Sequence, residues 1–175
     1  MPFTPFHMGP GILIKALFQG GFSLMIFGWS QIVMDIQPLI VLLTHEGHLH
    51  GFSHTYIGAT LLAIFSALSG KYLSELVLRW LDITNGDKPI IIVWWISFIS
   101  AFIGTYSHVL LDSLMHADLQ PYYPFSNVNH LLGLLNNEQI YLLCIITAIT
   151  GVIIYFTIIF LCKKPNPFKK IFKVR

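Results

Sequence analysis

The stretch GTYSHVLLD, residues 104–112, decides how this chain folds. It closes an apolar run, residues 90–111, that is long enough to cross a bilayer as an α-helix. His108 and Asp112 stand at the end of that run, four residues apart, so on a helix they lie one above the other on the same face. An imidazole and a carboxylate in this arrangement can supply half of a metal site.

The composition of the chain points to the same membrane environment. Only 10% of its 175 residues are charged, against about 25% in ordinary soluble proteins, and 55% are hydrophobic. A soluble chain of this length could not bury so much apolar surface. We therefore expect an all-α fold, a polytopic membrane bundle of four to five apolar helices with an interfacial polar cluster. Residues 1–162 would form a single integral-membrane helical domain, and residues 163–175 a basic cytoplasmic tail.

The pattern of apolar runs predicts where the helices lie. A short helix over 10–19 begins at a proline, and a second run over 22–43 contains Pro38, which would kink or split it. Further apolar segments are residues 55–69, 90–111 and 139–162. Charges between 70 and 88 predict a loop with an amphipathic helix, and prolines between 113 and 138 predict a polar loop.

The placement of the basic residues predicts the topology. Six of the ten Lys and Arg fall in the last thirteen residues, which places the C-terminal tail in the cytoplasm by the positive-inside rule. Following the runs backward, the loop 113–138 and the histidine-rich segment 44–54 lie outside, and all eight histidines come to or near the outer boundary. The lipid bilayer is therefore the expected partner. No basic face recurs elsewhere, so we expect no nucleic-acid partner. The oligomeric state stays open.

A second pair of potential ligands repeats the spacing of the first. His50 and His54, in HGFSH, are again four residues apart. One such pair alone could simply bond to backbone carbonyls at the interface. Its recurrence as His108 and Asp112, on a helix where an unpaired carboxylate costs several kcal/mol, favours a shared metal ion. Imidazole and carboxylate suit a divalent transition metal such as zinc, iron or manganese better than calcium, and zinc is our leading expectation.

Two further residues could complete the ligand set. Asp35 lies at membrane depth in the second apolar run, where it is either a metal ligand or general base, or a partner of Gln31 in a helix-packing hydrogen bond. Pro38 would unwind the helix and lift Asp35 toward the site. His7, just before the first helix, is either a ligand delivered from the N-terminal segment or an exposed interfacial residue.

The remaining polar residues give weaker signals. Glu46 is a candidate base, but the zinc-protease pattern H-E-x-x-H would need a histidine where Leu49 stands. His116 and Asp118 could bind a substrate or a second ion, or belong to a solvated loop. We assign His130 to the surface.

These residues together resemble a known family. GTYSHVLLDS, followed in the loop by Pro124-Phe125, resembles the signature of the YdjM-like family of LexA-binding, inner-membrane-associated, metal-dependent hydrolases. The matching positions, in chain order, are His7, then Asp35 with Pro38, then His50 to His54, then His108 to Asp112. The resemblance implies a multi-pass protein of the inner (cytoplasmic) membrane with a metal held by these residues.

The match also departs from the family pattern. The acidic motif usually has two aspartates around a proline, whereas DIQP, residues 35–38, has one. Gly51 replaces the arginine that follows the first histidine, and the second histidine comes four residues later instead of five. The incomplete acid pair implies either one metal ion in place of two or a lost activity.

The leading functional hypothesis is a membrane-embedded, metal-dependent hydrolase at the outer lipid interface, acting on a small-molecule or lipid-like substrate such as an amphipathic ester or phosphoester. Its metal would be held by His50, His54, His108 and Asp112, completed by His7 or Asp35, with Asp35 or Glu46 as the base. One alternative is a non-enzymatic membrane protein with a structural metal site or an ion-handling role. Another is a membrane di-iron oxidase, which normally needs adjacent histidine pairs that this sequence lacks.

Overall fold

The computed structural model describes residues 4–85 and 88–162, and these form an all-α fold, as the sequence predicts. The α-helices are α1 (Met8–Phe18), α2 (Leu24–Thr44), α3 (Tyr56–Trp80), α4 (Trp94–Met115) and α5 (Asn137–Leu161). The short elements are the 3-10 turns η1 (Thr4–His7), η2 (Gln19–Gly21) and η3 (Phe52–His54) and the paired two-residue strands β1 (Thr84–Asn85) and β2 (Lys88–Pro89). The predicted basic tail, 163–175, lies outside the described residues.

Helices α2, α3, α4 and α5 are each long and apolar enough to cross a membrane. Helix α1 has 11 residues, a rise of about 16 Å, which is too short to cross alone. The chain reverses at η2, where the Lys15 ammonium donates hydrogen bonds to the carbonyls of Gln19 (2.6 Å) and Phe22 (2.8 Å). Helix α1 therefore enters the bundle part of the way and returns through α2.

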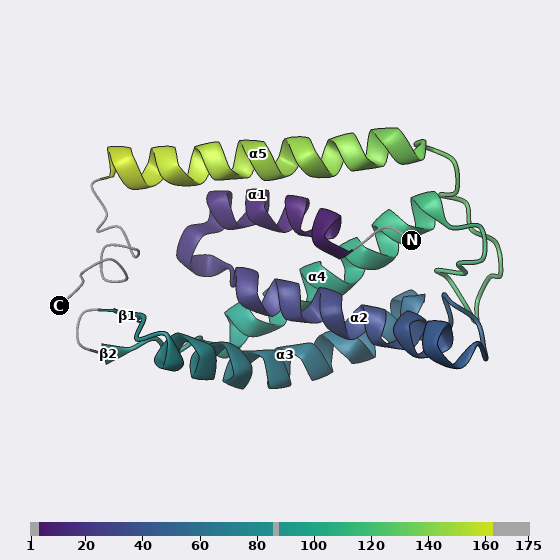
Figure 1. The fold of residues 1–175 in the computed structure, drawn as a ribbon, viewed down its shortest axis with the longest axis horizontal. Coiled ribbons are helices and arrows are strands. Elements are labelled where there is room, and N and C mark those ends of the chain that lie inside the picture. The colour runs from purple at the N-terminus through teal and green to yellow at the C-terminus, as the bar shows by residue number, and fades with distance from the viewer. Residues whose placement is uncertain (1–3, 86–87, 163–175) are drawn as a thin grey trace.

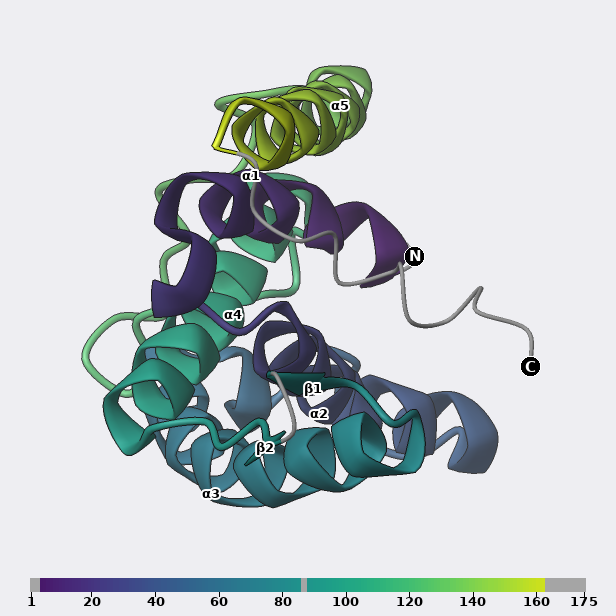
Figure 2. The same ribbon diagram turned by 90° about the vertical axis from the view of Figure 1, so that its left-hand side faces the viewer.

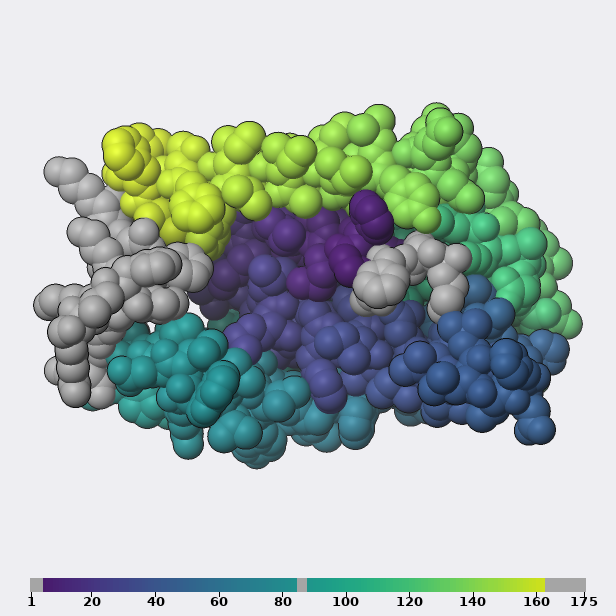
Figure 3. Space-filling model, viewed as in Figure 1, coloured from purple at the N-terminus to yellow at the C-terminus, as the bar shows by residue number. Residues whose placement is uncertain are grey.

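The helices pack in two layers with α1 between them. Helices α2, α3 and α4 lie together, α5 lies on the opposite side of α1, and both views show this order (Figures 1 and 2). Side chains of α1 fill the space between α5 and α2 (Figure 3). Glycines let the backbones of α1 and α5 approach each other closely. A Cβ at Gly9 of α1 would lie 2.0 Å from the carbonyl oxygen of Cys144, and a Cβ at Gly151 of α5 would lie 2.6 Å from the backbone nitrogen of Leu13. This contact fixes the start of α1.

Helix α3 corrects the prediction that residues 70–88 form a loop with an amphipathic helix of its own. The helix that begins at Tyr56 continues to Trp80, and two of its charged residues are paired within it. Lys71 and Glu75, four residues apart, form a buried ion pair, and the Glu75 carboxylate also accepts a hydrogen bond from the Ile92 backbone at 2.9 Å. The charges that suggested a loop therefore join α3 to the segment that leads into α4.

Helix α2 runs unbroken through Pro38, which is buried, so the expectation of a helix split or unwound there is wrong. Pro38 removes one N–H from the helix, and packing against neighbouring helices tolerates that loss. Asp35 is therefore carried by a regular helical turn.

The histidines gather at one end of the bundle. Helices α1, α3 and α5 begin there and α2 and α4 end there, opposite the β1–β2 turn (Figure 1). His7 precedes α1, four histidines lie between the end of α2 and the start of α3, His108 lies in the last two turns of α4, and the other two follow α4. The predicted clustering at one boundary thus appears in the fold.

Replacing Gly9 with Ala should destabilise the bundle, because the added Cβ meets backbone atoms of Cys144 that cannot rotate away. We expect a loss of about 1–3 kcal/mol, the usual cost of overpacking. Thermal unfolding of the purified protein in detergent measures this loss as a lower midpoint. Gly20→Ala is the matched control, since a Cβ at Gly20 meets nothing within 4 Å. Equal midpoints for the two variants would contradict the proposed role of the close α1–α5 contact.

Candidate metal centre

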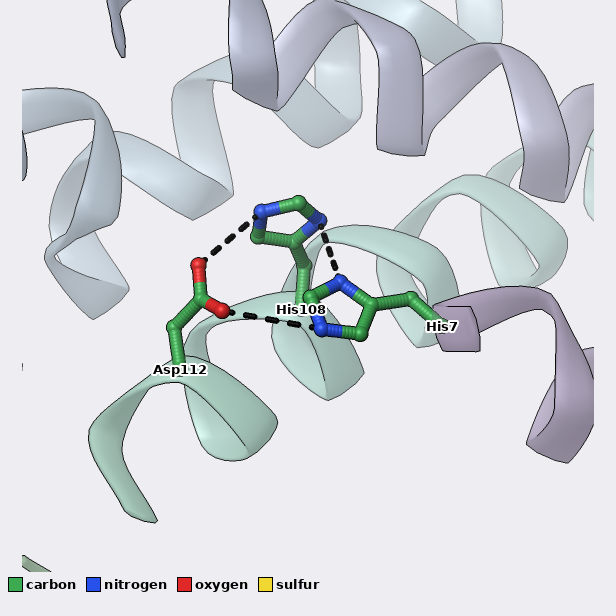
Figure 4. Close-up of side chains that lie close together, drawn as sticks. All are labelled: His7, His108 and Asp112. Atoms are coloured by element: carbon green, nitrogen blue, oxygen red, sulfur yellow. Dashed lines mark hydrogen bonds and ion pairs between the residues drawn. The ribbon is translucent and has the colours of Figure 1, made fainter. Parts of the chain in front are cut away.

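Five potential ligands from four elements converge at the histidine end of the bundle. They are His7 from η1, Asp35 from α2, His54 from η3, and His108 and Asp112 from α4. Four are almost fully buried, with relative exposures of 2% for His7, 1% for His54, 0% for His108 and 3% for Asp112. Figure 4 shows two imidazoles facing the Asp112 carboxylate, with His7 reaching in from the start of the chain and His108 from α4.

The distances describe one compact group. The Asp112 carboxylate lies 3.6 Å from His7 Nε2, 3.5 Å from His54 Nε2 and 3.2 Å from His108 Nε2. His108 Nε2 also lies 3.3 Å from the Asp35 carboxylate. The potential ligand atoms form two overlapping triplets, one with His7 and Asp112 and one with Asp35 and His54, that share His108. Because both triplets include His108, they belong to one group of potential ligands.

The hydrogen bonding of these atoms fits a bound cation. Within the described residues, His7 Nε2, His54 Nε2, His108 Nε2 and Asp112 Oδ1 are all buried without a hydrogen-bond partner. Such atoms carry a large desolvation cost unless something pairs with them. Ligands about 2.0–2.1 Å from a tetrahedral zinc ion lie roughly 3.3 Å from each other, which is close to the separations of 3.2–3.6 Å observed here.

Neighbouring polar groups orient two of the imidazoles. The Gln31 amide nitrogen donates to the carbonyl of Gly104 (2.9 Å), so its oxygen accepts from His108 Nδ1 (2.7 Å). His108 is thereby held as the tautomer whose Nε2 lone pair faces the centre. His54 Nδ1 similarly contacts the hydroxyl of Ser53 at 2.8 Å. Both ends of the Gln31 amide engage α4, and the expected hydrogen bond between Gln31 and Asp35 stays a prediction.

Local structure brings each ligand into place. A Cβ at Gly104 would lie 1.9 Å from the hydroxyl oxygen of Ser30, so this glycine permits the close crossing of α2 and α4 that sets Asp35 beside His108. The turn η3, which carries His54, is tied to α2 because the Gln37 amide oxygen accepts from the Ser53 backbone at 3.0 Å.

Burial keeps His7 and His54, which lie outside the membrane-spanning helices, in the neutral form that binds metals. It lowers the pKa of His7 to about 4 and that of His54 to about 3. Both imidazoles are therefore unprotonated at neutral pH and offer a lone pair.

The structure places His50 apart from the centre to which the sequence assigns it. Its imidazole lies 2.9 Å from the carboxylate of Asp118 and stacks on His116 with 4.3 Å between ring centroids. Its ring centroid is 5.2 Å from that of His54, so the two groups are neighbours. The i,i+4 spacing expected for a helical pair does not apply, because His50 precedes the turn η3 that contains His54.

The other polar candidates lie outside both groups. Glu46 is exposed in the segment after α2 and its side chain belongs to neither ligand group of the described residues. His130 is exposed, as expected. Sequence reasoning did not identify the orienting roles of Gln31 and Ser53. Their proximity in sequence, four residues before Asp35 and directly before His54, was the available signal.

The fold and the site define a class: a multi-pass helical membrane protein with a buried cluster of potential metal ligands at one end of its bundle. The family model described as YdjM inner membrane protein matches residues 14–171, and the chain belongs to that family. This confirms the family suspected from the sequence and the inner membrane as its location. No curated protein and no solved structure matches the chain. The family match begins after His7, so the assignment of His7 as a potential metal ligand rests on its position in the structure.

Replacing Gln31 with Leu should weaken metal binding, because it removes the acceptor that orients His108. Loss of such a supporting contact typically costs 10–100-fold in metal affinity. Zinc dissociation constants of the folded variants, measured by competition with a chelating dye, test this expectation. Gln31→Glu keeps an acceptor oxygen and should retain more affinity than the leucine variant. Unchanged affinity in Gln31→Leu would remove Gln31 from the centre.

Proposed function

We propose that this protein is a membrane-embedded, metal-dependent hydrolase. The observation that carries the proposal is the convergence of buried imidazole nitrogens and a carboxylate oxygen that lack hydrogen-bond partners. The residues that would hold the ion are His7, His54, His108 and Asp112. Zinc is the proposed metal because its preferred ligands are histidine nitrogen and carboxylate oxygen.

When bound to these residues, a divalent ion would supply a Lewis acid and would lower the pKa of a water molecule beside it. Asp35 is the proposed general base. Its side chain is 32% exposed, whereas that of Asp112 is 4% exposed, so Asp35 can receive a proton at the centre and release it to solvent. Glu46, the other base considered, has no contact that would support this role in the described structure. The exclusion of water by the nearly complete burial of His54 and His108 strengthens electrostatic interactions within the site.

An amphipathic ester or phosphoester is the proposed substrate class. His108 is seven residues from the end of α4, about 10 Å along the helix axis, which would put the centre near the boundary between headgroups and acyl chains. An apolar groove of about 780 Å³ is also lined by residues from the start of α1, the first half of α2 and the last part of α3. Two of its lining residues, Pro5 and Met8, flank His7 in sequence. This arrangement supports a substrate with an acyl portion beside a polar head.

Removing a central ligand should abolish metal binding at the buried centre and hydrolysis together. We expect Asp112→Asn and His108→Ala, purified in detergent and dialysed against metal-free buffer, to lack the tightly bound zinc equivalent that elemental analysis finds in the wild type. Hydrolysis of short-chain ester and phosphoester substrates should fall in parallel. His130→Ala, an exposed histidine outside the site, is the control and should keep both. A folded Asp112→Asn protein with full zinc content would refute the proposed centre. If the two variants instead fail to fold and the wild type hydrolyses none of the substrates, the metal site is structural.

We also propose that the histidine end faces away from the cytoplasm. The connections at that end, 45–55 and 116–136, contain no Lys or Arg, whereas Arg79 and Lys88 lie toward the opposite end. Six more basic residues follow α5. The positive-inside rule then puts the C-terminus in the cytoplasm.

Fusions to the C-terminus test this orientation. A green fluorescent protein fused after Arg175 should fluoresce, and alkaline phosphatase fused at the same place should be inactive. The same reporters inserted after Asn127, in the connection between α4 and α5, should give the opposite pair of results. Active phosphatase at the C-terminus would reverse the proposed orientation.

A further inference from the structure

A second group of potential ligands lies beside the buried centre and shares no residue with it. His50, His116 and Asp118 each offer one ligand atom, and the three atoms lie within 4.8 Å of one another. His50 Nδ1 is 2.9 Å from Asp118 Oδ2. The rings of His50 and His116 stack with centroids 4.3 Å apart and planes inclined by 27°. Two connections at the histidine end supply this group, since His50 lies just before η3 and His116 and Asp118 follow α4.

Contacts among the protein groups leave part of this cluster unsatisfied. Asp118 engages one nitrogen of His50, but His116 Nε2 is buried and has no hydrogen-bond partner in the described structure. An imidazole nitrogen with no partner, next to a second imidazole and a carboxylate, matches what a divalent transition metal requires.

The group is reachable from outside the bundle. His50 and Asp118 line a pocket of about 330 Å³ together with His48, Gln120 and Tyr123. The Asp118 side chain is 56% exposed and that of His50 is 10% exposed. A cation can therefore reach this group without opening the helices, whereas His7, His54, His108 and Asp112 of the neighbouring centre are almost fully buried.

We infer that His50, His116 and Asp118 form an outer binding site for a second divalent transition-metal ion, at the mouth of the buried centre. Two imidazoles and one carboxylate favour zinc or cobalt over calcium or magnesium. Three protein ligands leave coordination positions for water, so the outer ion exchanges more readily than one held by the buried donors. The site stands on its own residues and does not depend on the proposed hydrolase activity.

Cobalt titration of the full-length protein in detergent tests this inference, since bound Co²⁺ reports its environment by visible absorption and equilibrium dialysis gives the count. We expect two equivalents in the wild type, one tight and one weaker. Asp118→Asn and His116→Ala should each remove the weaker equivalent and keep the tight one. His130→Ala, which changes an exposed histidine of the same connection, should keep both. Circular dichroism and size-exclusion profiles establish that each variant is folded.

The Asp112→Asn variant separates this inference from the proposed function. If the wild type binds one equivalent that is lost in Asp118→Asn and His116→Ala but kept in Asp112→Asn, the outer site stands and the buried centre fails. If the single equivalent is lost only in Asp112→Asn, the outer site is overturned. Two equivalents in both Asp118→Asn and His116→Ala, or none in the wild type, would likewise overturn it.

Discussion

The Asp112 carboxylate is buried among three imidazoles in an apolar bundle, and the arrangement of the surrounding elements depends on compensating its charge. A buried charge needs a partner, and His7, His54 and His108 surround it at 3.2–3.6 Å without closing hydrogen bonds through their Nε2 atoms. Neutral imidazoles with lone pairs turned toward a carboxylate would repel it. The proposed cation would remove this conflict, because it would accept lone pairs from all of them.

Several features of the fold serve to hold those donors in place. The short helix α1 does not cross the membrane, but it delivers His7 to the end of α4 and is fixed there by close contact with α5. The crossing of α2 and α4 at Gly104 lets Gln31 reach His108. The short helix α1 therefore has a structural role, because it brings His7 into a group of potential ligands built mainly on α4.

The buried and outer groups divide the polar residues of the histidine end between them. His54 belongs to the first and His50 to the second, and their rings lie 5.2 Å apart. The segment HGFSH thus supplies one residue to each group, because the turn η3 points the two side chains to different neighbours. An ion at the outer group would lie between the aqueous phase and the buried ligands, where it would affect the electrostatics of both.

The sequence by itself determined the class of fold, the helical content and most of the polar residues that the structure brings together at the histidine end. Long apolar runs with few charges can satisfy their backbone in lipid only as helices, and His108 and Asp112 share a face by helical period alone. Only the tertiary structure decided which donors meet. The separation of His50 from His54, the engagement of Gln31 with α4, and the continuation of α3 past Lys71 all depend on contacts between segments distant in sequence. Local periodicity carries no information about such contacts, because they are set by how closely the helices can approach.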